Sequence, residues 1–572
     1  YGGRLSSVLD IRMKEGNRKE FHGEGAVGVI ASRLTLEGPL NKKTSYLISG
    51  RRTYLDALAA PFVAATNDGN SGGYYFYDLN GKINHRFNDA HQLYLSYYQG
   101  ADVVYINGSN KGTDGDGIRY SEKTNFGLDW GNRIGTARWN YRINPRLFTN
   151  TTATYSRYRF NTDVSQENEY IDANGARDYQ KLRLGLSSFI EDYGVKWDAD
   201  WLPNNRHTVK VGAGIIHHTF EPGIQTFEFD FGNGGALDTN SGSNRHYAWE
   251  SAVYVQDDFS LTKRLKMNAG LHWATFQVGS STYSSLQPRW SARYLINANS
   301  SFKASAVKMT QFLHLLTNQT IGLPTDLWVP VTDRIAPQQA WQVAAGYAHV
   351  LRNGLNLSVE GYYKDLQNVV EYKDGANLIL QNHLETELIP AQGQSYGLEL
   401  YVKKNLGTLT GWISYTYSRS LRRVITPFEE ENINNGAWYA SNFDKPHDLT
   451  LIGNYKVSTN ASISATFAYS TGRPITFPEA KFDFSGNNLA YFNSRNQQRL
   501  PDFHRLDFSV NFKLNGEGKF FDGDWTFSVL NVYGRKNPFS IFFDDAASQP
   551  PQAFRLALLG IPLPSLSYAI SF

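Results

Sequence analysis

The chain has no cysteine among its 572 residues, which excludes disulfide bonds. The absence of thiols fits a protein that works outside the cytoplasm. It does not require that location, because a chain can also lack cysteine by chance.

Long apolar runs are missing as well. The longest, Ala57 to Ala65, is nine residues and includes Pro61. A membrane helix needs roughly 20 consecutive apolar residues, so the sequence excludes one. If the chain lies in a membrane, it must do so as a closed β-barrel, the only other structure that satisfies its backbone hydrogen bonds in lipid.

An excess of charge of either sign is also absent. Lys and Arg number 56 against 53 Asp and Glu, a formal net charge of +3, and no long Lys/Arg run occurs. These features argue against nucleic acid as a partner.

Aromatic residues and glycine are abundant. The chain has 35 Tyr, 34 Phe, 12 Trp and 50 Gly. Aromatics at membrane interfaces and glycines in twisted strands are both typical of a large barrel. The length agrees, because a soluble core stops growing at roughly 250 to 300 residues, whereas a membrane barrel needs no single core.

The last residues alternate with the period of a strand. Leu566, Tyr568, Ile570 and Phe572 share one face, and small, mostly polar residues share the other. This pattern fits a wall between lipid and water, and it fits an amphipathic sandwich strand equally well.

Turn signals along the chain alternate between two kinds. Tight reversals rich in Asn, Pro or Gly, which join adjacent antiparallel strands, occur at 88–90, 143–146, 202–205, 261–264, 297–300, 352–354, 405–407 and 458–460. Longer polar segments lie between them, at 56–72, 106–121, 161–180, 221–245, 311–337, 372–392, 422–444, 472–500 and 535–560. From about Glu20 to Phe572 we predict 22 strands, an even number that returns Phe572 to the rim of the short turns. The sequence therefore predicts an all-β, antiparallel transmembrane barrel with short periplasmic turns and long extracellular loops.

Two glycine motifs match enzyme patterns only superficially. Gly23, Gly25 and Gly28 have dinucleotide-binding spacing, but more strand follows instead of a helix, which indicates barrel glycines. Ser71 in Gly69-Asn-Ser-Gly-Gly73 has nucleophile-elbow spacing, yet a strand follows it too.

Possible metal ligands are sparse. His217 and His218 are adjacent, so a strand would point them to opposite sides and prevent joint chelation. Asp114 and Asp116 could contribute to a Ca²⁺ site, but a plain turn is the simpler interpretation. The acidic run 429–431 is interpreted as a solvated loop. We expect no metal and no cofactor.

The aromatic residues of the long loops are the best ligand-binding candidates. Tyr, Trp and Phe can stack on a ligand at low entropic cost. The candidates are Trp328, Trp438, Tyr439, Tyr491 and Phe492. The competing interpretation for each is an aromatic girdle or packing between loops.

Several segments, taken in order, resemble those of TonB-dependent outer-membrane receptors, particularly of the Bacteroidetes type. The opening residues 1–11 look like the last strand of that family's plug domain. Later segments resemble recurrent features of its barrel, namely 255–258, 287–289, 443–449, 471–475, 499–507 and 531–538. The terminal aromatic residue also resembles the strand by which outer-membrane barrels are recognised for insertion.

This resemblance implies a plug end and linker at 1–18 and a barrel at 19–572, in the bacterial outer membrane. It implies energised uptake through TonB, ExbB and ExbD, a TonB box upstream of Tyr1, and insertion by the barrel assembly machinery. The chain opens without a signal peptide, so we expect a processed or truncated form. We also expect a plug in the native protein, because a barrel of 22 strands is otherwise an open pore. Large, ungated conductance of the full-length protein would contradict that.

The implied function is uptake of a scarce ligand: a siderophore, haem, a corrinoid, an oligosaccharide or a peptide. A surface lipoprotein is a possible partner, although the short barrel favours a stand-alone receptor. The alternatives are a passive porin and an assembly or secretion scaffold. We expect no enzymatic activity, because the scattered histidines form no catalytic set with Ser or Asp.

Overall fold

The computed structural model describes residues 2–57, 70–232, 235–242, 245–317, 327–376, 384–484, 487–514, 523–544, 552–557 and 560–572. Strands dominate these residues. They are β1 (His22–Gly28), β2 (Ala31–Asn41), β3 (Thr44–Thr53), β4 (Ser71–Arg86), β5 (His91–Thr113), β6 (Arg119–Asn144), β7 (Leu147–Ile171), β8 (Arg177–Asn204), β9 (His207–Asp230), β10 (Ala236–Gly242), β11 (His246–Ser260), β12 (Leu265–Val278), β13 (Ser281–Leu295), β14 (Ser300–Gln311), β15 (Leu313–Leu316), β16 (Leu327–Pro330), β17 (Gln338–Val350), β18 (Leu355–Tyr372), β19 (Leu388–Lys404), β20 (Leu409–Arg423), β21 (Tyr439–Ala440), β22 (His447–Lys456), β23 (Ala461–Ser470), β24 (Pro474–Ile475), β25 (Ala480–Phe484), β26 (Asn487–Tyr491), β27 (Gln498–Arg499), β28 (Phe503–Leu514), β29 (Gly523–Leu530), β30 (Ser540–Asp544), β31 (Gln552–Leu556) and β32 (Leu563–Ser571). Short 3-10 helices are η1 (Arg352–Gly354), η2 (Leu384–Glu387), η3 (Glu429–Glu431) and η4 (Ile433–Gly436). No helix within these described ranges is long and apolar enough to cross a membrane.

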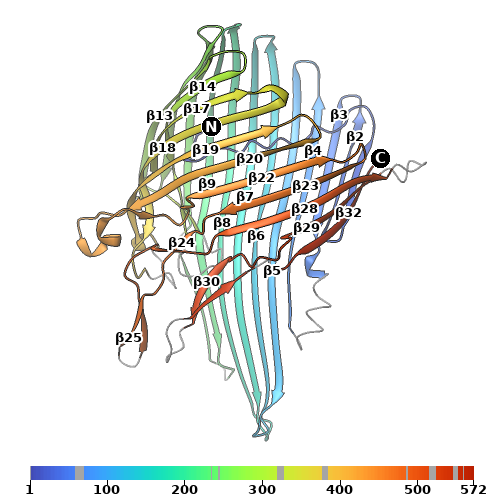
Figure 1. Cartoon of the computed structure of the whole chain (residues 1–572). Coiled ribbons are helices and arrows are strands. Elements are labelled where there is room, and N and C mark those ends of the chain that lie inside the picture. The colour runs from blue at the N-terminus through green and yellow to red at the C-terminus, as the bar shows by residue number, and fades with distance from the viewer. Residues whose placement is uncertain are drawn as a thin grey trace.

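The strands form one closed antiparallel barrel (Figure 1). Within the described residues the main sheet has 24 strands, of which β10 and β21 are short additions to β9 and β20. The remaining 22 close the barrel, because β1 pairs with both β2 and β32. The predicted strand number and fold class are confirmed.

The closing seam accommodates the terminal aromatic residue. Val27 of β1 lies opposite Tyr568 of β32, and the Phe572 ring packs on Phe21 with 6.1 Å between ring centroids. A side chain at Gly23 would overlap the Phe572 ring. Gly23 therefore leaves space for the Phe572 ring where the barrel closes. All three glycines of the dinucleotide-like motif lie in β1, as predicted.

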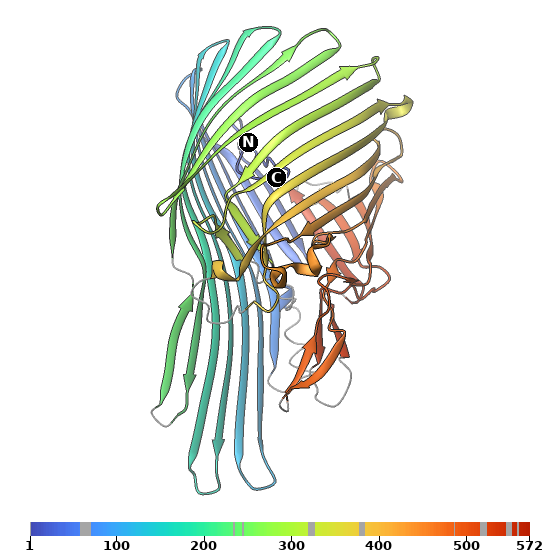
Figure 2. The ribbon, with the colours of Figure 1, turned by 90° about the vertical axis from the view of Figure 1, so that its left-hand side faces the viewer.

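The two rims of the barrel differ as the turn signals predicted (Figure 2). At one rim, strands reverse within a few residues, for example between Asn144 and Leu147 and between Asn204 and His207. At the other rim, several connections are long, and three of them contain the small hairpins β15–β16, β25–β26 and β30–β31, whereas β1–β2 and β12–β13 reverse tightly there. Short turns mark the periplasmic rim of such barrels and long loops the extracellular rim.

Three segments predicted as loops are mostly strand, which corrects the sequence interpretation. Residues 106–121, 161–180 and 221–245 fall largely in β5 to β9 and β10, and β5 to β9 run for 23 to 28 residues. Crossing the membrane takes only about 10 residues. The hydrogen-bonded ladder of these strands continues beyond the lipid. Neither face of a strand must be apolar there, so the alternation of apolar and polar residues that identifies a membrane strand is missing from the sequence.

The polarity of this extended sheet reverses above the membrane. On β8, Tyr193, Val195 and Trp197 face lipid, and farther along the same face Arg183 pairs with Asp163 at 2.7 Å. The opposite face carries an apolar row across neighbouring strands: Ile106, Phe126, Val164, Leu184 and Phe227. That face continues the barrel lumen, so an apolar row lies on this side of the extracellular mouth.

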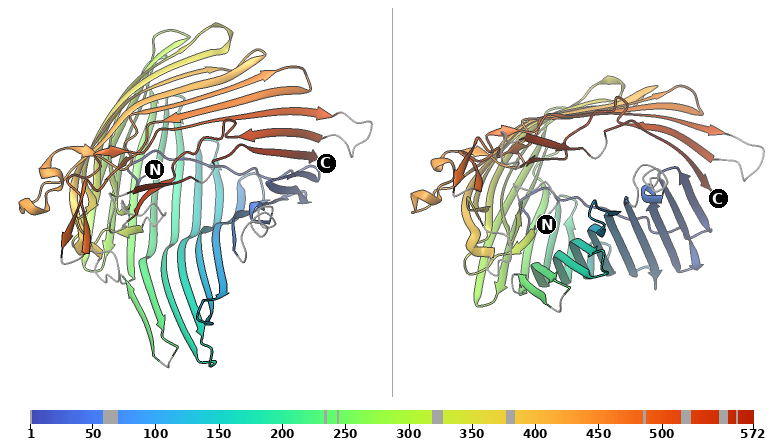
Figure 3. Two further views of the ribbon diagram at one scale, coloured as in Figure 1. Left: turned by 60° about the horizontal axis from the view of Figure 1, so that its bottom comes forward. Right: turned by 90° about the horizontal axis from the view of Figure 1, so that it is seen from below.

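The amino-terminal residues lie inside the ring of strands (Figure 3). Leu5 is buried, and its backbone accepts a hydrogen bond from Lys364 Nζ (2.6 Å) and donates one to Gln311 Oε1 (3.2 Å). Farther along, the backbone oxygen of Glu15 accepts a hydrogen bond from Ser45 Oγ at 3.1 Å. This segment therefore runs along the lumen before it enters β1.

The remaining motifs have structural roles. Ser71 is the first residue of β4, and Gly69 lies outside the described residues. His217 contacts Trp249 on the outer face, whereas His218 bonds Asp192 at 2.7 Å on the luminal face, as strand geometry predicted.

Candidate ligand site at the extracellular mouth

Four extracellular connections meet at one side of the mouth. They follow β14, β18, β20 and β23, and the segment around Arg495 and Asn496 joins them. Arg495 and Asn434 exchange two hydrogen bonds between side chain and backbone, at 2.7 and 3.0 Å. Asn496 Nδ2 donates to the Ala440 oxygen at 2.9 Å and to Asn442 Oδ1 at 2.8 Å. Such cross-links hold the loops in one arrangement.

Arg495 also ties this segment to the end of β18. Its guanidinium pairs with Glu371 at 3.4 Å and with Asp374. Burial raises the pKa of the Glu371 carboxyl, and the guanidinium groups of Arg422 and Arg495 oppose that rise. The ion pairs are therefore the reason that a carboxylate can lie at this depth.

A second buried carboxylate organises the neighbouring loop. Asp444 is fully buried and accepts hydrogen bonds from Arg419 Nε (3.2 Å), the Ser420 backbone N–H (2.6 Å) and Arg499. Asp444 and Arg499 belong to two of the segments that carried the family resemblance. Their role in the structure is to clamp the loop after β20 onto the loop before β28.

A polar cavity of about 120 Å³ lies between these loops. Its lining combines amides and hydroxyls with one buried ion pair and an exposed phenyl ring: Gln311, Leu315, Thr317, Gln338, Val369, Val370, Glu371, Arg422, Ser441, Asn442 and Phe443. Arg422 Nε lies 3.6 Å from Glu371 Oε1. Asn442 Nδ2 donates to Thr317 Oγ1 at 3.2 Å, which links two walls of the cavity.

An apolar cluster lies beside the polar cavity. Phe312 and Leu313 from the β14–β15 junction pack on Phe220 and Phe276 of the barrel wall, with 5.0 Å between the Phe276 and Phe312 ring centroids. His314 is fully buried here, and burial lowers its pKa to about 4. Gln338 Nε2 lies 2.8 Å from His314 Nδ1, so the neutral ring has an amide partner.

The predicted aromatic residues occupy separate places. Trp328 in β16 packs against the Phe220 and Phe312 cluster. Trp438 stacks on the Arg423 guanidinium, 4.8 Å from its ring centroid, and Tyr439 is buried in a cluster with Val369 and Val424. Tyr491 and Phe492 are exposed, at and just after the end of β26. Tyr439 thus lies near the polar cavity, and the structure does not bring all five together.

Sequence reasoning missed the charged and amide residues of the cavity. Glu371 and Arg422 of the cavity and the neighbouring Arg495 lie far apart in the sequence, and Gln311 and Gln338 carry no motif. A signal existed only for Phe443 and Asp444, in the segment 443–449, and for Arg499, in the segment 499–507. The acidic run predicted as a solvated loop forms η3, where Glu431 pairs with Lys373 at 2.9 Å. Asp114 Oδ1 accepts two backbone N–H groups of its own turn, each at 2.9 Å, as a plain turn residue would.

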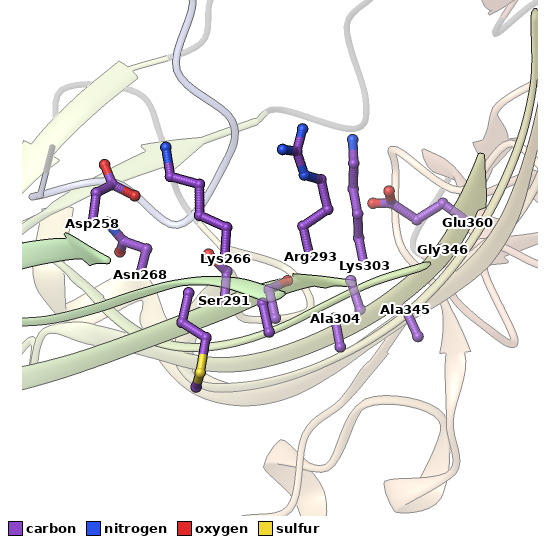
Figure 4. Close-up of a pocket in the computed structure, with 14 residues that line it drawn as sticks. Asp258, Lys266, Asn268, Ser291, Arg293, Lys303, Ala304, Ala345, Gly346 and Glu360 are labelled. Atoms are coloured by element: carbon purple, nitrogen blue, oxygen red, sulfur yellow. The ribbon is translucent and has the colours of Figure 1, made fainter. Parts of the chain in front are cut away.

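A second cavity, of about 390 Å³, lies on the luminal wall near the short-turn rim (Figure 4). Lys266, Arg293 and Lys303 are cross-strand neighbours there, and their side chains project into the lumen. Asp258 and Glu360 flank them. Within the described residues no group of three His, Asp or Glu side chains could hold a metal ion.

Comparisons with known proteins find one matching family and several similar solved structures. The model of the "TonB dependent receptor-like, beta-barrel" family matches residues 53–533. Solved structures with similar folds include the ferric-catecholate import receptor of E. coli K12 (TM-score 0.61, 13% identity, 98% of this chain and 82% of that chain). They also include the ferric yersiniabactin uptake receptor of Yersinia pestis (0.62, 12%, 98% and 81%) and the ferripyoverdine receptor of Pseudomonas aeruginosa (0.61, 12%, 98% and 73%). No curated protein matches the sequence.

Proposed function

This chain belongs to the TonB dependent receptor-like β-barrel family, and we propose that it binds a scarce ligand at its extracellular mouth and imports it past a plug that TonB displaces. Members of this family are transporters of the bacterial outer membrane rather than enzymes, and they work with TonB, ExbB and ExbD.

The observation that carries the proposal is the organised mouth above a wide barrel. A passive pore needs no buried ion pairs between its loops, whereas a receptor gains affinity when its binding groups are held in place beforehand. Arg495, Asn496 and Asp444 supply this order beside a polar cavity. The apolar inner face of the extended sheet supplies the opposite side of the mouth.

The amino-terminal residues support a plug. We assign 1–18 to the end of the plug and its linker, and 19–572 to the barrel. The contacts of Leu5 with Gln311 and Lys364 suit a segment that leads from a luminal domain into β1. Lys266, Arg293 and Lys303 form no ion pair with any described residue, and such a basic cluster suits a wall that faces such a domain.

The ligand class is open among siderophores, haem, corrinoids, oligosaccharides and peptides. The three structures named above are named for ferric ligands, so ferric siderophores are the first candidates to test. We retain Trp328, Trp438, Tyr439, Tyr491 and Phe492 as proposed contacts, because each belongs to an extracellular connection. Trp328 and Tyr439 would need loop movement to expose their rings.

Further proposed partners follow from the same reasoning. The terminal residues Leu566 to Phe572 are proposed as the signal read by the barrel assembly machinery. We favour a stand-alone receptor of the Bacteroidetes type over one that works with a surface lipoprotein.

Growth of a deletion strain tests the proposal. With iron complexes, haem, corrinoids or glycans supplied singly as the limiting nutrient, we expect loss of growth on one class and rescue by the intact gene. Normal growth on all of them would contradict an uptake role. Rescue that persists without TonB would favour the porin alternative, and a general assembly defect would favour the scaffold.

A further inference from the structure

We propose that the cavity beside Arg422 is a subsite for a carboxylate group of the imported ligand. This inference rests on the proposed import function and specifies part of its ligand. It follows from the surroundings of one buried guanidinium.

Arg422 lies flat on the neighbouring strand. It is paired in register with Gly393 of β19, and a side chain at Gly393 would collide with Arg422 Nη1. The glycine therefore gives the guanidinium room to lie across β19, facing the cavity that both Arg422 and Glu371 line.

This guanidinium lacks acceptors. A guanidinium carries five N–H donors. Within the described residues its one ion pair is the 3.6 Å contact with Glu371, and Nη1 is buried without a hydrogen-bond partner. The side chain is only 13% exposed. A buried cation in this state is strongly disfavoured unless another acceptor arrives.

The buried charges around Arg422 sum to a net positive charge, which an anion would neutralise. Glu371 is shared between Arg422 and Arg495, so two buried guanidinium groups share one buried carboxylate. Asp374, the other partner of Arg495, is 69% exposed. One added carboxylate would restore the balance.

The size and lining of the cavity favour a carboxylate over a phosphate. A volume of about 120 Å³ admits a small planar group. Guanidinium and carboxylate match as planar, two-bond partners. Arg422, Arg495 and Glu371 together leave one positive charge, so a phosphate dianion beside Glu371 would leave one negative charge without a partner. The amide of Gln338 and the hydroxyl of Ser441 line the same space, and the exposed Phe443 ring offers a stacking surface at its edge.

The test uses the whole protein purified from outer membranes and placed in lipid nanodiscs. The probes are benzoate and its neutral isostere benzamide, with binding measured by saturation-transfer NMR titration. We expect benzoate to bind at least tenfold more tightly than benzamide. Arg422→Gln, which removes the charge and keeps a polar side chain, should abolish this preference, and Gly393→Ala should weaken it by displacing the guanidinium.

The matched control is the adjacent arginine. Arg423 bonds Gln392 at 2.7 Å and stacks on Trp438, so Arg423→Gln should leave the preference unchanged. Heat-modifiable migration on gels verifies that each variant is folded. Equal affinity for the two probes, no binding of either, or full selectivity in Arg422→Gln would overturn the proposal. Because this binding needs no TonB, its failure would leave the import function to be judged by the growth test.

Discussion

Arg495 joins segments that are more than a hundred residues apart in the sequence. Its partner Glu371 lies at the end of β18, Asp374 follows that strand, and Asn434 follows β20. No spacing rule relates these positions, because closure of the barrel is what brings their loops together. The sequence could therefore predict aromatic loop residues as a class but not this ionic network.

Replacing Arg495 tests whether the network orders the loops. Arg495→Ala leaves Glu371 with the more distant Arg422 alone, and breaking a buried ion pair costs about 3 kcal/mol. We expect faster hydrogen exchange in residues 429–442. The control is Arg473→Ala, at an exposed arginine of the same connection whose side chain bonds only the Phe539 backbone oxygen among the described residues. Unchanged exchange in Arg495→Ala would show that the loops are ordered by other contacts.

His314 gives the β15–β16 hairpin a pH dependence. Burial lowers its pKa to about 4, against about 6.5 when the hairpin opens. Above pH 6.5 the ring is neutral in both states. As the pH falls below that value, His314 takes up a proton in the open state but not in the closed state. The free energy needed to open the hairpin therefore falls by about 2 kcal/mol between pH 7.5 and pH 5.

Hydrogen exchange of residues 313–316, corrected for its intrinsic pH dependence, measures this loss. We expect His314→Gln to remove the pH dependence. His447→Gln, at an exposed ring that bonds Tyr415, should retain it. An opening free energy equal at the two pH values would contradict the prediction.

The terminal strand is the element that the sequence described best. Alternation along Leu566 to Phe572 fitted a barrel strand and a sandwich strand equally, the alternating turn signals favoured the barrel, and β32 closes it against β1. The sequence could not show that Gly23 receives the Phe572 ring, because that contact joins the two ends of the barrel.

Two glycines of β1 provide a matched test of the seam. Gly23→Ala would overlap the Phe572 ring, and overpacking of this kind costs about 1 to 3 kcal/mol. Gly25→Ala would place its Cβ 3.7 Å from Leu34 Cδ1, an ordinary contact. We expect less heat-modifiable barrel in outer membranes for the first variant and a normal amount for the second. Equal assembly of both would mean that the terminal ring is free to move aside.

The long strands β5 to β8 show where sequence periodicity stops being informative. Alternation identifies a strand only where one face must be apolar, and above the membrane the outer face of β8 turns from Tyr193 and Val195 to Ser187 and Arg183. Loss of the apolar face was therefore interpreted as the start of a loop.

The membrane boundary on β8 can be tested on one face of one strand. Val195→Arg places a charge against lipid and should destabilise the barrel by about 2 to 4 kcal/mol in urea unfolding from vesicles. Ser187→Arg, eight residues nearer the extracellular tip on the same face, should have little effect. Similar losses at both positions would mean that the membrane extends farther along β8 than the reversal of polarity indicates.

At the scale of the whole molecule, the number of strands and the two unequal rims could be predicted from the sequence. Short turns have local signatures, and their spacing indicated the number of strands, although the tight turns between β1 and β2 and between β12 and β13 were not recognised. The proposed binding surface has no such signature, because it is assembled from four loops and one inner sheet face. Side chains such as Gln311, Arg422 and Arg495 come close to one another only in the closed barrel.

The most direct test of the account is the energy dependence of uptake. Cells that carry the intact gene should accumulate the radiolabelled form of the ligand class identified by growth, and accumulation should fall to the level of the deletion strain when TonB is removed or a protonophore is added. Accumulation that depends on this gene but continues unchanged without TonB would contradict energised import and identify the barrel as a passive channel.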